Sequence, residues 1–180
     1  MTRLFVAIDF EQKTKKRLED FTKKLDIKDA RVVPAKNIHI TVKFLGYVEE
    51  SILPEIKKVL SSIANKHGPF NVTLDRLGAF PSKRKGRIFW LGSRKNEAAN
   101  SFADDLDKKF QALGFKLEKR AFKIHLTLAR LKKPINLEKA TNAKISSVDQ
   151  KVSHISLFES KITPKGAQYR VLEKYYLKRA

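Results

Sequence analysis

The sequence predicts an α+β protein in which one strand–helix–strand unit occurs twice. Three observations support this prediction. Segments with alternating apolar and polar residues, typical of strands, are separated by segments with apolar residues at helical spacing. The order strand–helix–strand is found in each half of the chain. Each copy ends with the same pattern, His-x-Thr, at residues 39–41 and 125–127. We therefore expect a single domain over residues 1–180, made of two pseudo-symmetric lobes.

The elements of the first half of the chain follow from its periodicity and its turn residues. Residues 11–25 place Leu18, Phe21 and Leu25 on one helical face among lysines and glutamates. Ser51 is a suitable N-cap for the next helix. The expected elements are a strand over 4–10, a helix over 11–25, a strand over 31–33 that ends at Pro34, a strand over 37–45 that Gly46 stops, and a helix over 51–64.

The second half is interpreted in the same way. Phe102, Leu106 and Phe110 share one face of a helix, and Gly114 is suited to stop it. The expected elements are a strand over 70–75, a loop that contains Gly78, Pro81 and the basic run 83–87, a strand over 88–91, a helix over 96–113, a strand over 121–130, and a closing hairpin of 152–162 and 169–178 around residues 164–166.

The composition excludes several classes of protein. The 180 residues include no cysteine, which excludes a disulfide framework, a zinc ribbon, an iron–sulfur site and a thiol nucleophile. With 42% hydrophobic residues, the chain can form a packed core and is not expected to be disordered. No apolar run reaches the ~20 residues that span a bilayer, and the first residues do not form a secretory leader. We expect a cytoplasmic protein that does not bind membranes.

The charge of the chain predicts a polyanionic partner. Lysine and arginine number 39 against 19 aspartates and glutamates, so the formal net charge is +20. A basic excess of this size favours binding to the phosphate backbone of a nucleic acid. The alternative is a lysine-rich solvated surface without a partner, as in heat-adapted proteins.

The two His-x-Thr segments place their polar side chains on one face of a strand. Apolar residues alternate with His39 and Thr41 and, in the same phase, with His125 and Thr127. Because side chains alternate between the faces of a strand, each histidine lies ~7 Å from its threonine on one face, and the apolar residues face the core. One such histidine is most often structural. Two in equivalent positions of a duplication indicate a shared functional surface.

Two imidazoles and two hydroxyls suit a displacement at phosphorus. Histidine has an unperturbed pKa near ~6.5, so one imidazole can act as a base while the other, protonated, acts as an acid. Threonine hydroxyls can donate hydrogen bonds to the phosphoryl oxygens on which negative charge grows. A metal centre needs at least three protein ligands, and no cluster of Asp, Glu or Cys accompanies the histidines. We expect catalysis without a metal or a cofactor.

A family resemblance becomes specific at these segments. Residues 37–46, Asn-Ile-His-Ile-Thr-Val-Lys-Phe-Leu-Gly, and 125–130, His-Leu-Thr-Leu-Ala-Arg, resemble the paired signatures of the 2H phosphoesterase superfamily. Within it, the chain is most similar to the RNA 2′,3′-cyclic phosphodiesterase family, also called 2′-5′ RNA ligase. The resemblance covers nearly the whole chain and includes residues 31–34 and 86–92. It implies two antiparallel sheets that flank a central cleft, with the helices outside.

The resemblance also implies an activity and roles for the site residues. It implies that an RNA 2′,3′-cyclic phosphate end is opened to a 2′-phosphate, with reversible 2′-5′ joining of RNA ends that needs no ATP. By resemblance His39 is the proton donor, His125 is the proton acceptor, and Thr41 and Thr127 hold the phosphate. The near symmetry of the two segments leaves the acid and base roles interchangeable on sequence alone. The partner is RNA, with tRNA halves as one candidate substrate, and we expect a monomer.

Three further residues are candidates for binding the substrate. Arg130 extends the second segment, although strand parity places it on the face opposite the second histidine. Lys43 shares the phase of the first histidine and is expected at the cleft or its rim. Tyr47 is placed to stack on a nucleobase. Phe44 is in phase with core residues, so we expect it in the core.

Two alternative functions stay open at this point. A noncatalytic module that holds RNA ends explains the charge equally well, but arginine or lysine would bind phosphate better than histidine does. A phosphoesterase for small cyclic nucleotides would share the histidines. Strong salt sensitivity with long RNA but not with a dinucleotide would favour the RNA enzyme.

Overall fold

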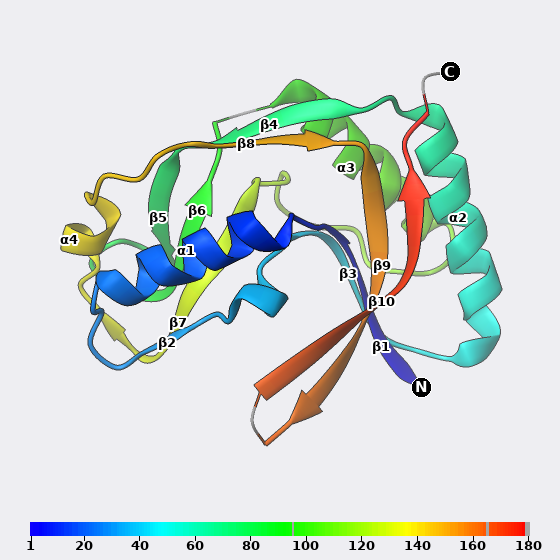
Figure 1. Ribbon diagram of the computed structural model, residues 1–180. Coiled ribbons are helices and arrows are strands. Elements are labelled where there is room, and N and C mark those ends of the chain that lie inside the picture. Colours follow the sequence, from blue (N-terminus) through cyan, green and yellow to red (C-terminus); the bar gives the residue numbers. More distant parts are fainter. Residues whose placement is uncertain (95, 165, 179–180) are drawn as a thin grey trace.

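The computed structural model describes residues 1–94, 96–164 and 166–178, and this part of the chain forms two four-stranded antiparallel sheets with helices around them (Figure 1). The expected fold class is confirmed. The strand order is β10–β9–β1–β3 in one sheet and β2–β7–β6–β5 in the other, and β4 pairs with β8. The strands are β1 (Thr2–Ile8), β2 (Ala30–Val32), β3 (Ile40–Val48), β4 (Phe70–Leu74), β5 (Arg76–Phe80), β6 (Gly86–Gly92), β7 (His125–Ile135), β8 (Val148–Val152), β9 (His154–Thr163) and β10 (Gly166–Tyr176). The helices are α1 (Gln12–Lys24), α2 (Leu53–Lys66), α3 (Glu97–Gln111) and the short α4 (Glu138–Thr141), with 3₁₀ turns η1 (Ala35–Asn37) and η2 (Glu50–Ile52).

Each sheet contains an equivalent set of three strands. β1 lies between β3 and β9, and β6 lies between β7 and β5 in the same way. The fourth strand differs, because β10 extends the first sheet beyond β9 whereas β2 extends the second sheet beyond β7. The internal repeat therefore describes the three strands around the histidines better than it describes the whole sheets.

Two helices cross from one sheet to the other. α1 follows β1 of the first sheet but packs against η1, β2 and β7 of the second. α3 follows β6 of the second sheet but packs against β3 of the first and against α2. The apolar faces of these helices join one continuous hydrophobic core that includes residues of both sheets. This exchange ties the two sheets together and fixes the position of one histidine relative to the other.

The structure corrects several expected boundaries near the site. Residues 35–37 form the 3₁₀ turn η1, so β3 begins at Ile40, and His39 comes just before the strand. β7 begins at His125 and runs to Ile135, past the expected end near Arg130. Ser51 lies inside the 3₁₀ turn η2 and makes no side-chain cap, because α2 starts after it with a proline in its first turn.

Other departures are short elements that carried no clear signal. β5 occupies residues 76–80, where a loop was expected, and β8 and α4 were not expected at all. Gly114 follows α3 with a φ of +88°, as expected for a glycine stop. The expected turn at residues 164–166 includes Lys165, which lies outside the described residues. Among the described residues no helix is both long and apolar enough to cross a bilayer.

Candidate active site

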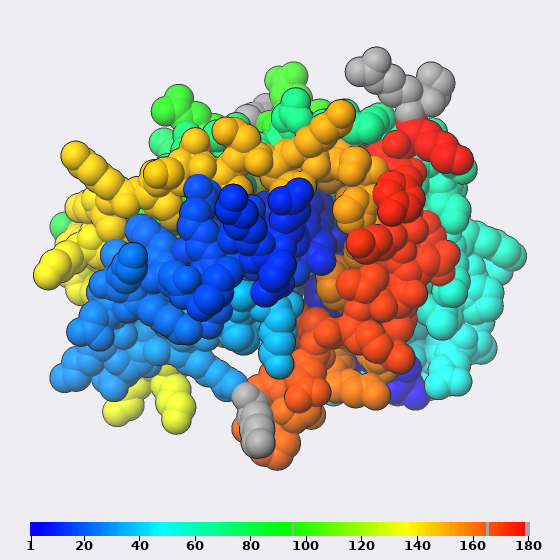
Figure 2. Space-filling view, viewed as in Figure 1, coloured from blue at the N-terminus to red at the C-terminus, as the bar shows by residue number. Residues whose placement is uncertain are grey.

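A pocket of about 410 Å³ is lined by both sheets and contains both histidines. In Figure 2 the molecule is hollowed between the segment around residues 31–37 and the projecting β9–β10 hairpin. Segments far apart in the sequence meet here, because β1, β3 and the β9–β10 hairpin form one wall and β7, with the neighbouring β2 segment, forms the other. The lining residues are Arg3, Phe5, Arg31, Val32, Val33, Pro34, Lys36, Asn37, His39, Thr41, Phe44, His125, Thr127, Arg130, Thr163, Gly166, Ala167, Gln168 and Tyr169.

The ring of His39 is held on several sides. Its Nδ1 lies 2.8 Å from the carbonyl oxygen of Asn37, and its Nε2 lies 2.9 Å from Oγ1 of Thr41. The ring packs against Phe5, with 4.8 Å between ring centroids, and meets the ring of Tyr169 edge-on at 5.2 Å. The imidazole is thus oriented by its neighbours before any substrate binds.

His125 is held in an equivalent way by different neighbours. Its Nδ1 lies 2.7 Å from the carbonyl oxygen of Lys123. The ring of Phe80 meets it edge-on, with 5.1 Å between centroids, and Trp90 lies behind it. Trp90 needs the glycine at position 78 on the neighbouring strand, because a Cβ there would approach the indole to 2.1 Å.

Both histidines present the same ring nitrogen to the pocket. In each, Nδ1 faces the carbonyl oxygen of the residue two positions earlier, Asn37 for His39 and Lys123 for His125. A carbonyl oxygen only accepts, so the Nδ1–H donates in both. In the neutral ring, Nε2 therefore carries the lone pair and is the atom that takes up or gives a proton.

Burial lowers the pKa of both imidazoles. For His39 loss of solvation is the largest cause and brings the pKa to about 4, although the hydrogen bond to Asn37 opposes it. The same cause lowers the pKa of His125, with a further contribution from the nearby positive charge of Lys123. The guanidinium of Arg130 lowers both pKa values, so its charge acts on both rings. At neutral pH both rings are neutral in the free protein.

A β-bulge follows the threonine in each segment and reverses the strand parity. In β3, Thr41 pairs with Ala7 and Lys43 with Val6, which leaves Val42 as the extra residue. In β7, Thr127 pairs with Trp90 and residue 129 with residue 89, which leaves residue 128 as the extra one. Each bulge turns the third residue after the threonine back to the face of the histidine.

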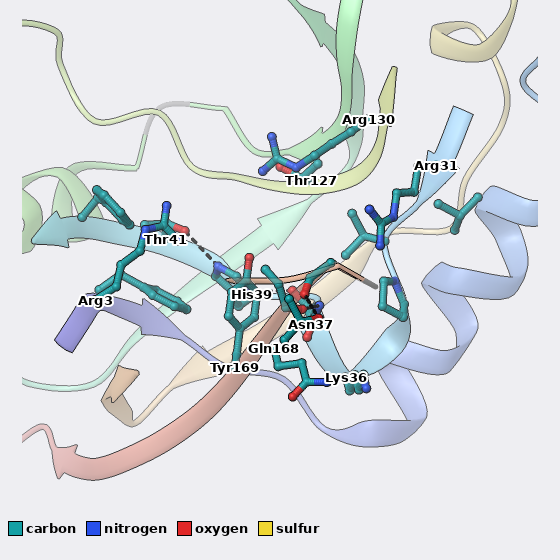
Figure 3. A pocket seen from close by; sticks show the side chains of 18 of the residues that line it. Arg3, Arg31, Lys36, Asn37, His39, Thr41, Thr127, Arg130, Gln168 and Tyr169 are labelled. Carbon is teal, nitrogen blue, oxygen red and sulfur yellow. Dashed lines mark hydrogen bonds between the residues drawn. The ribbon is translucent and has the colours of Figure 1, made fainter. Parts of the chain in front are cut away.

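The bulge in β7 places Arg130 in the pocket. Strand parity alone predicted the opposite face, and that expectation is wrong. The side chains of Arg130 and Thr127 lie across the pocket from His39 and Tyr169 (Figure 3). The pocket therefore has a fixed positive charge next to both imidazoles.

The bulge in β3 overturns two other expectations. Lys43 does not face the cleft: it is 3% exposed, and its ammonium is paired with Asp107 of α3 and donates to the carbonyl of Lys116. Phe44, expected in the core, is 44% exposed and lines the pocket. Tyr47 is exposed but is not among the pocket-lining residues.

Several pocket residues carried no signal in the sequence. Lys36, Gln168 and Tyr169 have no motif around them, and they reach the pocket only because η1 and the β9–β10 hairpin meet there. Asn37 Nδ2 donates to the carbonyl oxygen of Ala167 at 2.8 Å, which attaches the hairpin to η1. Among the described residues no group of three or more His, Cys, Asp or Glu side chains is suited to hold a metal ion.

Burial of the His39 ring predicts a loss of stability in acid. The unfolded chain takes up a proton on this ring below pH 6.5, whereas the folded protein does so only near pH 4. Stability from this group is therefore complete above pH 6.5 and is lost as the pH falls. At about 1.4 kcal/mol for each pKa unit, the loss reaches about 3 kcal/mol at pH 4. Urea unfolding of wild type and His39→Gln at pH 7.5 and pH 4 measures it, because the variant should lack this part of the decrease. An equal decrease in both proteins would mean that the ring is solvated.

The fold and the site together define a class of protein. A duplicated two-sheet α+β fold whose common pocket contains two His-x-Thr segments is that of the 2H phosphoesterases. The sequence model of the family described as LigT like phosphoesterase matches the chain twice, over residues 8–90 and 91–169, in agreement with the internal repeat. The chain belongs to this family.

Individual relatives match over nearly their full length. The chain is 35% identical to the RNA 2′,3′-cyclic phosphodiesterase of Methanocaldococcus jannaschii, over 96% of this chain and 99% of that protein. It is 32% identical to the protein of the same name from Methanothermobacter thermautotrophicus, over 97% and 98%. The crystal structure of a Thermus thermophilus protein, TT0787, matches with a TM-score of 0.81 at 26% identity and 98% coverage of both chains. The fold of E. coli LigT complexed with 3′-AMP matches with the same TM-score of 0.81 at 23% identity, over 99% of both chains.

Proposed function

We propose that this phosphoesterase opens RNA 2′,3′-cyclic phosphate ends to 2′-phosphates, with His39 and His125 as an acid–base pair. One observation carries the proposal: both Nδ1 atoms are occupied by backbone carbonyls, which leaves two Nε2 atoms for proton transfer in one pocket. The relatives named RNA 2′,3′-cyclic phosphodiesterase support the choice of reaction and substrate. The net charge of +20 suits an RNA partner.

The proposed reaction moves one proton at each histidine. His125 accepts a proton from water as the water oxygen attacks phosphorus in line with the 3′ oxygen. The bond between phosphorus and the 3′ oxygen breaks, and His39 gives its proton to that oxygen. The product carries a 2′-phosphate and a 3′-hydroxyl. Proton exchange with solvent returns both rings to their starting state.

The donor ring must first gain a proton that it lacks in the free protein at neutral pH. The cyclic phosphate carries a negative charge, and an anion beside an imidazole raises its pKa. Substrate binding and proton uptake are therefore coupled in this proposal. The positive charge of Arg130 lowers both histidine pKa values in the free protein. The bound anion offsets this charge, so the lowering becomes weaker.

The threonines and Arg130 stabilise the phosphoryl group in this scheme. Oγ1 of Thr41 donates to the neutral Nε2 of His39 in the free protein. Once that ring is protonated, the hydroxyl is released to donate to a phosphoryl oxygen, and Thr127 does the same from the other wall. Arg130 adds a fixed charge where negative charge grows.

The same arrangement accommodates the joining of RNA ends. If the 5′-hydroxyl of a second RNA takes the place of water, His125 deprotonates it and the 3′ oxygen leaves as before, which forms a 2′-5′ linkage without ATP. Two halves of a tRNA are one such pair of ends. The proposed enzyme acts as a monomer in the cytoplasm and uses no metal.

The first experiment tests the reaction itself. The purified protein is incubated, with EDTA, with a short RNA that ends in a 2′,3′-cyclic phosphate, and the product terminus is identified by mass and by phosphatase sensitivity. A 2′-phosphate that is not formed by His125→Ala is the expected result. Salt-dependent binding without conversion would favour a noncatalytic module for RNA ends. Inhibition by EDTA that added metal reverses would contradict the mechanism.

Valine at Thr41 or Thr127 should slow the reaction by about 10- to 1000-fold, because each variant loses one hydrogen bond to the charge that develops on phosphate. Single-turnover rates with the same RNA measure this loss. Serine at the same position retains the hydroxyl and is the matched control, with a rate near that of wild type. Unchanged rates in both valine variants would make the threonines ordinary strand residues.

A further inference from the structure

The face of the first sheet continues from the pocket to the surface in three rows. The side chains of Arg3, Phe5 and Ala7 lie on the same face of β1, because successive side chains of a strand alternate between its faces. Their partners on β3 are Tyr47, Phe44 and Thr41, respectively. Side chains of directly paired residues lie side by side on the same face. The threonine that lines the pocket is thus followed by an aromatic row and then by a row with an arginine and a tyrosine.

Phe44 and Tyr47 of these two outer rows, together with Arg3, form an aromatic and cationic surface. Phe44 is 44% exposed and Tyr47 is 65% exposed. The guanidinium of Arg3 lies 4.5 Å from the centre of the Phe44 ring, and its Nη1 donates to Oγ of Ser160 at 2.7 Å. Exposed rings beside a fixed cation are the groups that hold the bases and the backbone of single-stranded nucleic acids.

The two walls of the pocket differ in chemistry at equivalent positions of the repeat. Phe44 pairs with Phe5 on β1, and Arg130 pairs with Ile88 on β6, so these two residues hold equivalent positions in the two sheets. One wall therefore offers an aromatic ring where the other offers a positive charge. The wall with Arg130 suits the reacting phosphate, and the wall with Phe44, which has Arg3 over its ring, suits a base and a further phosphate. Arg3 lies at one end of the pocket, away from Arg31 and Lys36 (Figure 3).

Tyr47, in the outermost row, is not among the residues that line the pocket of the histidines, whereas the side chain of Arg3 in the same row does line it. Ala7, beside Thr41, and Arg3, beside Tyr47, are four positions apart on β1. At about 3.3 Å per residue this is about 13 Å. Tyr47 is therefore placed to contact a part of the RNA chain beyond the nucleotide at the histidines, and the guanidinium of Arg3, over the Phe44 ring, lies between the two.

The geometry points to a second nucleotide subsite, in which Tyr47 stacks on the base of the nucleotide that precedes the cyclic phosphate and Arg3 pairs with the phosphate between the two nucleotides. This inference rests on the proposed function and narrows it. The preferred substrate is an oligonucleotide end, and a 2′,3′-cyclic mononucleotide is a poorer one.

The test compares kcat/KM for a dinucleotide that ends in a 2′,3′-cyclic phosphate with kcat/KM for the cyclic mononucleotide of the same terminal base. Wild type should favour the dinucleotide by at least about tenfold. Tyr47→Ala should lower this ratio by about 5- to 100-fold, the range that a base–aromatic stack supports. Tyr47→Phe should keep the ratio, and Arg3→Gln should lower it. Tyr176→Ala is the matched control, because Tyr176 is an equally exposed tyrosine of the same sheet outside the pocket.

A dinucleotide whose first nucleotide lacks its base provides an independent check. Wild type should process it as Tyr47→Ala processes the complete dinucleotide, and the variant should not distinguish the two. The second subsite is excluded, and the proposed function stands, if wild type processes the complete and the abasic dinucleotide with equal kcat/KM. The same holds if Tyr47→Ala and Tyr176→Ala give the same ratio of kcat/KM for the dinucleotide to kcat/KM for the mononucleotide. If neither substrate reacts, the proposed function itself fails.

Discussion

Alanine in place of His39 or His125 should lower the rate of cyclic phosphate opening by about 10²- to 10⁴-fold, the contribution of one positioned proton-transfer group. Each ring is held by a carbonyl at Nδ1 and offers only Nε2 to the pocket, so the alanine variant loses the one proton-transfer atom that the ring supplies. RNA affinity should change little, because the basic surface is untouched. Single-turnover rates and fluorescence anisotropy at one pH measure the two quantities. His154→Ala is the matched control, because His154 starts β9 and does not line the pocket.

A substrate with sulfur in place of the leaving 3′ oxygen separates the two roles. A thiolate leaves without a proton, so the variant that lacks the acid should regain most of its rate on this substrate. We expect this recovery for His39→Ala and not for His125→Ala. The opposite pattern would exchange the roles, which would suit a His39 ring whose pKa burial lowers to about 4 in the free protein. A rate near wild type for either variant on the ordinary substrate would remove the acid–base pair from the mechanism.

The sequence predicted the fold class and the two histidines because both depend on local periodicity. Helical spacing identified the three long helices, and strand alternation placed an apolar residue after each histidine and each threonine. Each His-x-Thr segment alone is a weak indication of a site, and their equivalent positions in the repeat make the pair a strong one. Which sheet each helix covers depends on tertiary packing, and α1 and α3 cross to the other sheet without any mark in the periodicity.

The errors near the site have one physical cause. Strand parity is reliable only until the first bulge, and here each His-x-Thr segment is followed by a bulge at the next residue. The expected positions of Lys43, Phe44 and Arg130 were therefore inverted together. Tyr169 was missed for a different reason. It contacts the ring of His39 from a hairpin that lies more than 100 residues later in the sequence than His39, and no local pattern records such a contact.

The inversion at Lys43 has an energetic consequence that can be measured. Its buried ammonium joins β3 of the first sheet to Asp107 of α3, and the other carboxylate oxygen of Asp107 accepts from the backbone N–H of Glu118 at 2.8 Å. Asp107→Ala leaves a buried cation without its main partner, so it should lower the free energy of unfolding by about 3–5 kcal/mol. Urea unfolding at neutral pH measures the difference. Lys66→Ala is the control. Lys66 at the end of α2 pairs with Asp105, which lies on α3 like Asp107, but the lysine is exposed, so this substitution should cost less than about 1 kcal/mol.

The double variant Lys43→Met with Asp107→Leu distinguishes a buried charge from a general loss of packing. Two apolar side chains of similar volume remove both charges together, so most of the stability lost in Asp107→Ala should return. If the double variant stays as unstable as the single one, the hydrogen bonds to Lys116 and Glu118 carry the stabilisation, and the ion pair does not. If Asp107→Ala costs no more than Lys66→Ala, the ammonium is solvated in solution. The ion pair with Asp107 would then contribute little to holding Lys43 inward at the bulge.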